Sequence, residues 1–314
     1  IKSRSLLGWQ IPILTDHNHS RARIEVINSK FIKDQLKIYD VLIIAGFQGI
    51  NKNNQITTLG RGGSDTSAVA ISASLGVNKC EIFTDVEGIY TADPRIVKKA
   101  KKIKNITYEE ILEMSSLGSK VLHPRSVELA MKYGITIHVK SSFVNKPGTV
   151  VLKEEKKLEK EVVTGIASSE NEAKITIKGI PDKPGIAAKI FGLLAKVNIN
   201  VDMIVQNITD DGKLASITFT VPTEDYSTSV SELKKSNIKF NKLHLDKKIC
   251  KISIIGVGMK SNVGVAQRMF ETLAKKNINI QVISTSEIKI SVLIPLDKKK
   301  IALEALHRAY RLDR

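Results

Sequence analysis

Aromatic residues and cysteines are scarce in this chain, and long apolar runs are missing. Of its 314 residues, 5% are aromatic and two are cysteines, Cys80 and Cys250. Scarce aromatic residues argue against a surface that stacks nucleic-acid bases. Two cysteines far apart in the sequence predict buried, reduced thiols rather than a disulfide framework. Without an apolar run of about 18 residues or a recognisable secretory signal, we expect a cytoplasmic protein with no membrane span.

The charge is strongly positive, with a formal net charge of +17. Lysines outnumber arginines by 39 to 10 and are spread along the whole chain. Runs such as 98–104 and 298–300 are therefore interpreted as solvated surfaces, and neither nucleic acid nor a membrane is expected as a partner. Anionic small-molecule ligands remain compatible with this charge. The polar cluster at 16–19 (DHNH) supplies too few ligands in fixed geometry to predict a metal site.

The most informative stretch is 57–67, TTLGRGGSDTS. Its glycines let backbone N–H groups approach a ligand without a Cβ in the way. The apolar helical run that follows, 68–75, adds free N–H groups and the positive end of a helix dipole. Together they predict an anion site, most simply for phosphate. The alternative is a tight strand-to-helix turn in which Ser64 or Asp65 caps the helix.

Strands and helices alternate through the first half. The apolar runs 40–48, 80–85 and 135–141 are interpreted as strands, and the first as a buried parallel strand. Helices are expected around 108–114 and 126–133. This alternation predicts an open, mostly parallel sheet with helices on both faces.

Two polar segments are expected at one edge of that sheet. Ligands of such sheets bind beyond the carboxyl ends of the strands. The turn at 60–65 follows one predicted strand end, and Thr84 and Asp85 lie at another. Two polar loops at one edge are better evidence for a site than either loop alone.

The second half contains a duplication. Residues 185–207 align with 264–286 at a constant offset of 79, with Phe191 and Leu194 matching Phe270 and Leu273. Each copy reads strand, helix, strand, strand, helix, which suggests a small ferredoxin-like α+β sandwich present twice. Such small modules are expected to pair with their twin or another subunit. The predicted domains are 1–150, a charged linker at 151–165, a first repeat at 166–245 and a second at 246–314.

Several motifs resemble the aspartate kinase family across essentially the whole chain. They are TTLGRGGSDTSAVAISASLG, FTDVEGIYTADPRIV, GSKVLHPRSVELA beginning at 118, and MIVQN and ISTSEIKISV within the repeats. The resemblance implies an amino-acid-kinase fold followed by two ACT domains. It also implies phosphorylation of the side-chain carboxylate of L-aspartate by Mg-ATP, the first step towards lysine, threonine and methionine.

The resemblance assigns residues of the first half to this reaction. The implied catalytic residues are Arg61, Ser64 and Asp65, with Arg61 binding the substrate α-carboxylate and Asp65 orienting a catalytic lysine. Substrate binding would involve Arg61, Gly62, Gly63 and Ser64. No resident metal site is implied, because Mg would be held mainly by the nucleotide phosphates. The implied ATP-binding residues are Gly60, Gly62, Gly63, Thr84, Asp85, Tyr90, Arg95 and Lys120.

The resemblance also implies feedback inhibition by lysine, threonine or both. The ACT pair would form a homodimer or a tetramer. Helix amino termini after Gly185 and Gly264 would bind the effector carboxylate, unless they are merely capping turns. The candidate effector residues are Asp182, Gly185, Ile186, Ala187, Gln206, Asn279, Ile280, Ser286 and Glu287.

One departure from the family leaves alternatives open. The family's Lys-Phe-Gly-Gly loop, which carries its catalytic lysine, and its Gly-Glu-Arg/Lys segment have no counterpart in this sequence. We therefore expect a chain that lacks an upstream segment and is not active alone. A noncatalytic amino-acid-sensing subunit is the alternative. Another amino-acid kinase, such as one acting on glutamate, is disfavoured by the ACT repeat.

Overall fold

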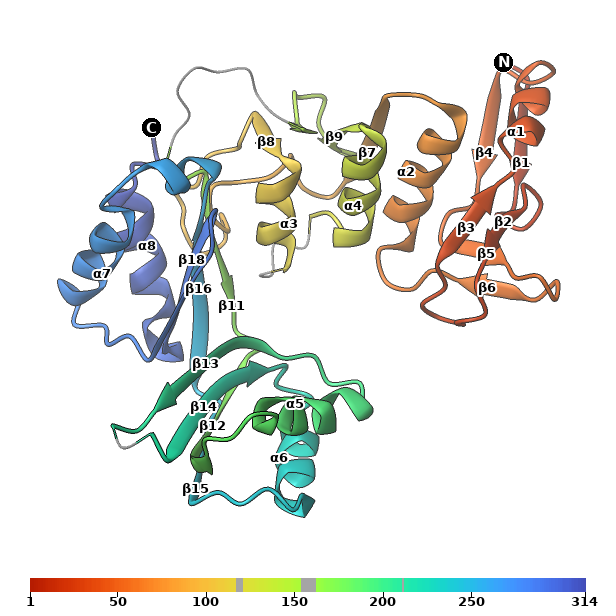
Figure 1. Ribbon diagram of the computed structural model, residues 1–314. Coiled ribbons are helices and arrows are strands. Elements are labelled where there is room, and N and C mark those ends of the chain that lie inside the picture. The colour runs from red at the N-terminus through yellow and green to blue at the C-terminus, as the bar shows by residue number, and fades with distance from the viewer. Residues whose placement is uncertain (117–120, 154–161, 211) are drawn as a thin grey trace. The chain divides into compact units, whose positions relative to one another are not determined.

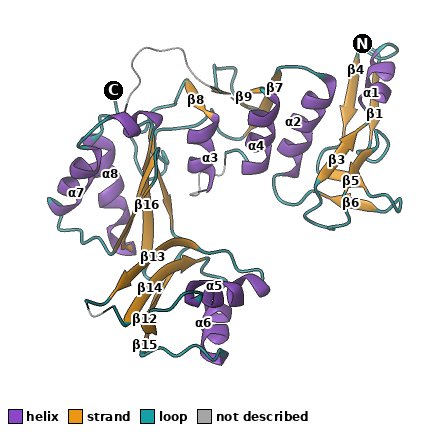
Figure 2. Cartoon of the chain, viewed as in Figure 1, coloured by secondary structure: helices purple, strands orange, loops and turns teal. Residues whose placement is uncertain are grey.

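A computed structural model describes residues 1–116, 121–153, 162–210 and 212–314 (Figures 1 and 2). The chain divides into two compact units, the first comprising 1–91 and 100–164 and the second 92–99 and 165–314. Most of the expected linker, at 154–161, lies outside the described residues. None of the helices within the described residues is long and apolar enough to cross a membrane.

The described part of the first unit contains three sheets with helices packed against them (Figure 2). β1 pairs with β4, a second sheet has the order β3-β2-β5-β6, and a third has the order β7-β9-β10-β8. The elements are β1 (Ser3–Leu6), β2 (Ile13–Thr15), β3 (Ile24–Ile27), α1 (Ser29–Leu36), β4 (Val41–Ile44), β5 (Gln48–Ile50), β6 (Ile56–Thr58), α2 (Gly63–Leu75), β7 (Lys79–Thr84), β8 (Asn105–Thr107), α3 (Tyr108–Ser116), α4 (Pro124–Tyr133), β9 (Thr136–Ser141) and β10 (Thr149–Leu152).

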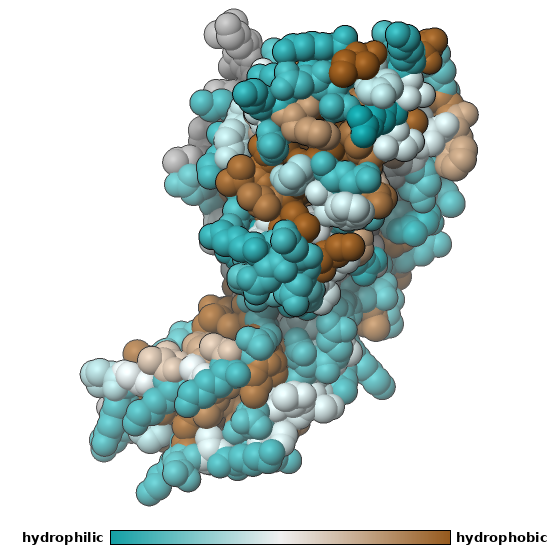
Figure 3. Space-filling view, turned by 90° about the vertical axis from the view of Figure 1, so that its right-hand side faces the viewer, coloured by the Kyte–Doolittle hydropathy of each residue, from teal (hydrophilic) through white to brown (hydrophobic). Residues whose placement is uncertain are grey.

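The mixed α/β class is confirmed, with parallel pairs β1–β4, β2–β5, β7–β9 and β8–β10. The expected strand at 40–48 is instead two short strands, because Phe47 adopts a positive φ of 72° and the chain turns after β4. β4 is not fully buried, since Val41 and Ile43 are 43% and 57% exposed. Figure 3 shows apolar residues lying among hydrophilic ones on the side that carries β1 to β6.

Among its described residues, the second unit contains two sheets of four strands each, both covered by helices. Their orders are β13-β14-β12-β15 and β11-β16-β18-β17. The elements are β11 (Gly165–Ser169), β12 (Ala173–Pro181), α5 (Ile186–Lys196), β13 (Asp202–Ile208), β14 (Leu214–Val221), α6 (Tyr226–Lys235), β15 (Lys242–Asp246), β16 (Ile249–Ile255), the 3₁₀ turn η1 (Val257–Ser261), α7 (Val265–Ala274), β17 (Val282–Thr285), β18 (Lys289–Pro295), the 3₁₀ turn η2 (Leu296–Lys298) and α8 (Lys299–Ala309).

The duplication appears in the structure as two matching modules, each with one strand more than the repeat predicts. β15 completes the first sheet beside β12. β11 pairs with β16 and so belongs to the second sheet, although it precedes the first module in the sequence. The sequence predicted 166–169 as part of the first repeat, but these residues form a strand of the second module's sheet. Repeat alignment could not reveal this, because an edge strand's partner depends on which sheet edge is free.

Alternation of apolar residues explains both module cores. In the first module Ile175 and Ile177 of β12 pack with Ile190 and Leu194 of α5 and with Phe219 of β14. The second module buries the corresponding residues of β16, α7 and β18: Ile252, Ile254, Met269, Leu273 and Val292. Cys80 and Cys250 are both buried and free, as the sequence predicts.

Stability of the second unit is expected to fall in mild acid because of His307 on α8. Its side chain is 2% exposed, and burial lowers the pKa of this imidazole below 6.5. The unfolded chain then binds more protons than the folded chain as the pH falls below about 6.5, so the unfolding free energy decreases there by at most about 1.4 kcal/mol per pH unit. Urea unfolding at several pH values should show a shallower decrease for His307→Gln than for the parent. Identical pH profiles would contradict this prediction.

Candidate active site

The glycine-rich turn leads directly into α2. Gly60 and Gly62 have φ values of 83° and 70°, which favour glycine. A Cβ on Gly60 would lie 2.5 Å from the carbonyl oxygen of Ser20, and one on Gly62 would lie 2.4 Å from the ring of His123. Both positions therefore require glycine for conformation and for space.

Gly62 is the N-cap of α2, and no side chain caps this helix. Ser64 and Asp65 lie within the first turn, so the capping role considered for them is wrong. An uncapped helix amino terminus keeps backbone N–H donors and a positive dipole end available to an anion. Arg61 and Ser64 are exposed beside these donors.

Asp65 is half-buried, whereas Arg61 and Ser64 are exposed. Burial raises the pKa of its carboxyl group, and a hydrogen bond from the backbone N–H of His123 partly opposes that rise. The pKa of His123 is lowered, first by burial and then by the charge of Arg125. At neutral pH the site therefore combines a partly desolvated carboxyl group with an uncharged imidazole beside the glycine turn.

Thr84 and Asp85 lie at the same end of the first unit as this turn. α2 packs against β7, and the short connection at 76–78 reverses the chain direction (Figure 1). The helix has 13 residues and the strand six, which makes each about 20 Å long. The carboxyl end of β7 is therefore near the amino end of α2. Thr84 Oγ1 donates a hydrogen bond to Asp85 Oδ1 at 3.1 Å.

The structure does not place the remaining predicted ATP-binding residues beside Thr84 and Asp85. Tyr90 is half-buried in the first unit and forms an antiparallel bridge with Lys102. Arg95 belongs to the second unit, where its guanidinium pairs with Asp93 at 2.8 Å. Lys120 lies outside the described residues. The structure thus brings together Gly60, Arg61, Gly62, Gly63, Ser64, Asp65, Thr84 and Asp85.

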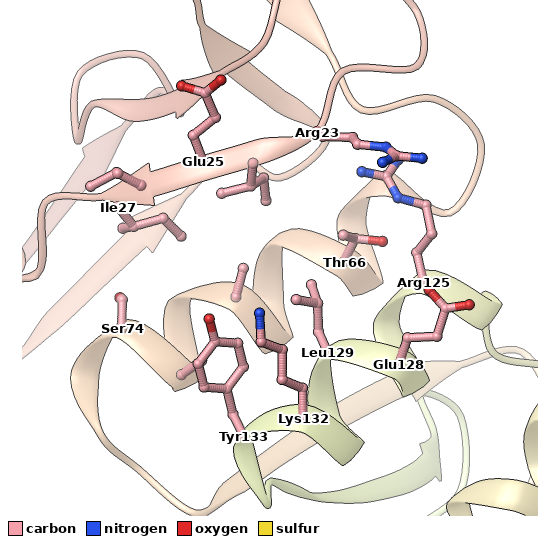
Figure 4. Close-up of a pocket in the computed structure, with 14 residues that line it drawn as sticks. Arg23, Glu25, Ile27, Thr66, Ser74, Arg125, Glu128, Leu129, Lys132 and Tyr133 are labelled. Atoms are coloured by element: carbon pink, nitrogen blue, oxygen red, sulfur yellow. The ribbon is translucent and has the colours of Figure 1, made fainter.

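A separate cavity of about 570 Å³ opens between β3, α2 and α4 (Figure 4). None of the predicted catalytic or nucleotide-binding residues lines it. It borders the site through Thr66, in the first turn of α2, and through Arg125, in the first turn of α4. The cavity is lined by Arg23, Ile24, Glu25, Val26, Ile27, Thr66, Ala70, Ala73, Ser74, Arg125, Glu128, Leu129, Lys132 and Tyr133.

Two residues that support the site were not assigned to it from the sequence. His123 packs against Gly62, although it is more simply interpreted from sequence as structural. Arg125 donates one hydrogen bond to the carbonyl of Leu59, immediately before the glycine turn. In the sequence, only their place in the HPRS segment could have linked them to the site. Their contacts with the glycine turn join residues more than 60 positions apart, and such contacts leave no local sequence pattern.

The effector candidates of the first module lie near one end of its sheet. The loop containing Asp182 and Gly185 follows β12, whose last residue, Pro181, pairs with Leu214. Gln206 is exposed on β13, two residues from Ile208, which pairs with Ala215 beside Leu214. Ile186 and Ala187 form the first turn of α5, which Gly185 caps with no side-chain hydrogen bond.

The second-module candidates divide between the two ends of β17. Ser286 and Glu287 follow the strand, and the Ser286 N–H donates to the Lys289 carbonyl at 2.8 Å. Because Lys289 pairs with Ile255, these residues lie where β16 leads through η1 towards α7. Asn279 and Ile280 precede β17 at its other end. The four second-module candidates that the resemblance implies are therefore separated by the length of β17.

Comparison with known proteins gives one consistent result. Residues 1–141 match the amino acid kinase family, and 175–236 and 252–310 each match the ACT domain. An aspartokinase of Pseudomonas aeruginosa is 50% identical over 313 residues, which cover 98% of this chain and 76% of that protein.

Solved structures agree with the sequence relatives. Aspartokinase III of E. coli in complex with aspartate and ADP is 27% identical, with a TM-score of 0.82 over 98% of this chain and 69% of that one. The same enzyme with lysine and aspartate gives a TM-score of 0.76 at 26% identity. With an amino-acid-kinase domain, two ACT domains and relatives at this level of identity, the chain belongs to the aspartate kinase family.

Proposed function

We propose that this protein transfers the γ-phosphoryl group of ATP to the side-chain carboxylate of L-aspartate, using the glycine turn and α2 as its phosphate and substrate site. The observation that supports the proposal is an exposed Arg61 between two positive-φ glycines, at the uncapped amino end of α2. The carboxyl end of β7 lies at the same end of the unit. The related E. coli enzyme was solved with aspartate and ADP.

The chemistry requires no general base. A side-chain carboxylate with an ordinary pKa of about 3.9 is already ionised near neutral pH and can attack phosphorus directly. Catalysis then depends on alignment and on neutralising the charge of the transferred group. Arg61 would bind the substrate α-carboxylate through two parallel hydrogen bonds. The backbone N–H groups of Gly62 and Ser64 and the Ser64 hydroxyl would face the phosphates, with Gly63 leaving room for their approach while its own N–H donates to the Gly60 carbonyl.

The remaining residues would bind the nucleotide. Thr84 and Asp85 would contact the nucleoside at the end of β7, Tyr90 would pack beside it, and Lys120 would reach its phosphates. Mg would be held mainly by those phosphates, and its charge would offset that of the triphosphate. Asp65 would orient a catalytic lysine, for which its half-buried carboxyl group and its hydrogen bond from His123 are suited.

The proposal is tested with the full-length protein, ATP, Mg²⁺ and hydroxylamine, which traps an acyl phosphate as its hydroxamate. We expect hydroxamate with L-aspartate and little with L-glutamate. A folded protein that binds amino acids but forms no hydroxamate would overturn the kinase assignment and favour a noncatalytic amino-acid-sensing subunit. Turnover with glutamate instead would point to another amino-acid kinase.

The ACT modules would bind lysine, threonine or both as inhibitors. The backbone N–H groups at the helix amino termini would donate hydrogen bonds to the effector carboxylate, and the side-chain oxygens of Asp182, Gln206 and Glu287 would accept hydrogen bonds from its ammonium group. Coupling requires two states of a homo-oligomer with different effector affinities, and we propose a dimer or tetramer joined through these modules. A cytoplasmic location, where ATP and free amino acids are available, fits this function.

Replacing Gln206 with alanine is expected to weaken inhibition without reducing uninhibited activity. Losing one hydrogen bond to a charged ligand should raise the half-inhibiting effector concentration by about tenfold. Inhibition curves with lysine and with threonine measure the shift, with Gln35→Ala in the other unit as control. An unchanged curve for Gln206→Ala would remove this residue from the effector site.

A further inference from the structure

Arg125 joins three segments that are distant in the sequence. It lies in the first turn of α4, directly after Pro124. Its Nη1 donates a hydrogen bond to the carbonyl oxygen of Leu59 at 2.6 Å, and its Nη2 donates to that of Ala22 at 2.9 Å. One guanidinium group therefore fixes the residue before Gly60 against the segment that leads into β3.

Both carbonyl groups belong to buried residues, since Leu59 is 1% exposed and Ala22 is fully buried. Within the described residues no carboxylate lies within 4 Å of the Arg125 guanidinium. The charge thus serves hydrogen bonds to backbone rather than an ion pair. Hydrogen bonds from a charged donor are stronger than neutral ones, and removing this donor would leave two buried acceptors without it.

Other contacts show why the position of Leu59 matters for the turn. The Leu59 N–H donates to the Phe47 carbonyl at 2.9 Å, and the Gly63 N–H donates to the Gly60 carbonyl at 2.9 Å. Gly60 lies against Ser20, and Gly62 lies against the ring of His123. The amino end of α4 therefore contacts the turn from both sides of Arg61, through Arg125 before it and His123 after it.

We infer that Arg125 is a positioning residue for the reaction: its guanidinium holds the glycine turn so that Arg61 and the first amides of α2 face the substrates. This inference rests on the proposed function of that turn. Arg125 itself contacts backbone and no reacting atom. A misplacement of about 1 Å at a reacting centre can cost about 10²-fold in rate, which sets the scale expected when this support is removed.

The cavity beside α4 provides a direct test. Arg125 lines it together with Arg23, and Figure 4 labels both side chains among the lining residues. Truncating Arg125 would leave a space, continuous with this cavity of about 570 Å³, that has the shape of the lost group. Methylguanidinium from solution can enter that space and donate to the same two carbonyl oxygens.

In the full-length protein, Arg125→Ala is expected to lower kcat/KM for aspartate by about 10²-fold, with the larger share in kcat. Methylguanidinium should restore part of that loss, whereas tetramethylammonium at equal concentration should not. Arg125→Lys should fall between the parent and Arg125→Ala, because an ammonium group lacks the planar fork that reaches both acceptors. Arg23→Ala, from the same cavity wall, should keep parent activity.

Hydrogen exchange separates this inference from the proposed function. Amides 60–63 should exchange faster in Arg125→Ala than in the parent or Arg23→Ala, and methylguanidinium should slow them again, whether or not the protein is active. Unchanged exchange and activity would overturn the positioning role. Faster exchange without a loss of activity would show that the turn is held by Arg125 but does not carry the reaction. A parent protein that is inactive on aspartate would refute the proposed function alone.

Discussion

Replacing Arg61 with alanine is expected to lower kcat/KM for aspartate by about 10²- to 10³-fold while the protein stays folded. Removal of one well-placed charge-stabilising donor typically costs this much in enzymes. Arg61 is exposed between Gly60 and Gly62, so its truncation removes no core packing. The loss should therefore be seen in kinetics and not in the unfolding free energy.

The conservative variant sharpens this expectation. Lysine keeps the charge but gives up the fork that binds a carboxylate through two parallel hydrogen bonds. Arg61→Lys should therefore recover only part of the activity and keep a raised KM for aspartate, with the KM for ATP less affected. Lys33→Ala, which removes an exposed cation from α1, is the control for net charge. An unchanged KM for aspartate in both Arg61 variants would rule out α-carboxylate binding by this residue.

What the sequence predicted about the site depended on local patterns. Glycines at positive φ, an apolar helix and a polar strand end are all encoded within a few residues, so the turn at 60–65 and the end of β7 were identified correctly as elements. The predicted reason for their common location, a shared edge of one parallel sheet, is wrong, because β6 before the turn and β7 belong to different sheets. The short connection between α2 and β7 places the two segments at the same end instead. The roles of these residues remain predictions that the kinetic experiments test.

What the sequence could not predict depended on long-range contacts. Arg125 reaches Leu59 and Ala22 across 66 and 103 residues, and nothing in the local HPRS segment indicates those partners. β11 is similar, because a short strand can pair with any free sheet edge. The break between β4 and β5 at Phe47 was also hidden, since an apolar run shows no sign of a positive φ at an aromatic residue.

An ionic cluster centred on a buried lysine connects the two modules of the second unit, with Glu172 nearly buried and Asp202 56% exposed. Lys251 of β16 is 4% exposed, and its Nζ lies 2.5 Å from Glu172 Oε1 and 2.6 Å from Asp202 Oδ2. Glu172 precedes β12 and Asp202 begins β13 in the other sheet. Apolar contacts of Met203 with Ile249, Val282 and Leu293 lie alongside. Burial alone would lower the pKa of Lys251, but the charges and hydrogen bonds of Glu172 and Asp202 raise it.

Lys251→Met is therefore expected to lower the unfolding free energy of the protein by about 3–5 kcal/mol, the range for breaking a buried ion pair. The cause would be the carboxylates left behind, chiefly Glu172, whose side chain is 10% exposed. Urea unfolding measures the change, and Lys248→Met, an exposed lysine before β16, should alter it little.

The double variant Lys251→Met with Glu172→Gln distinguishes an unpaired charge from lost packing. An uncharged glutamine costs less to bury than a lone carboxylate, so the double variant should be more stable than Lys251→Met alone, and the two substitutions should not be additive. Because the cluster links both sheets, Lys251→Met should also separate the unfolding of the modules, seen as a broader transition. A double variant less stable than Lys251→Met would show that the carboxylate of Glu172 stabilises the unit even without its lysine, which contradicts a cluster held together by charge pairing.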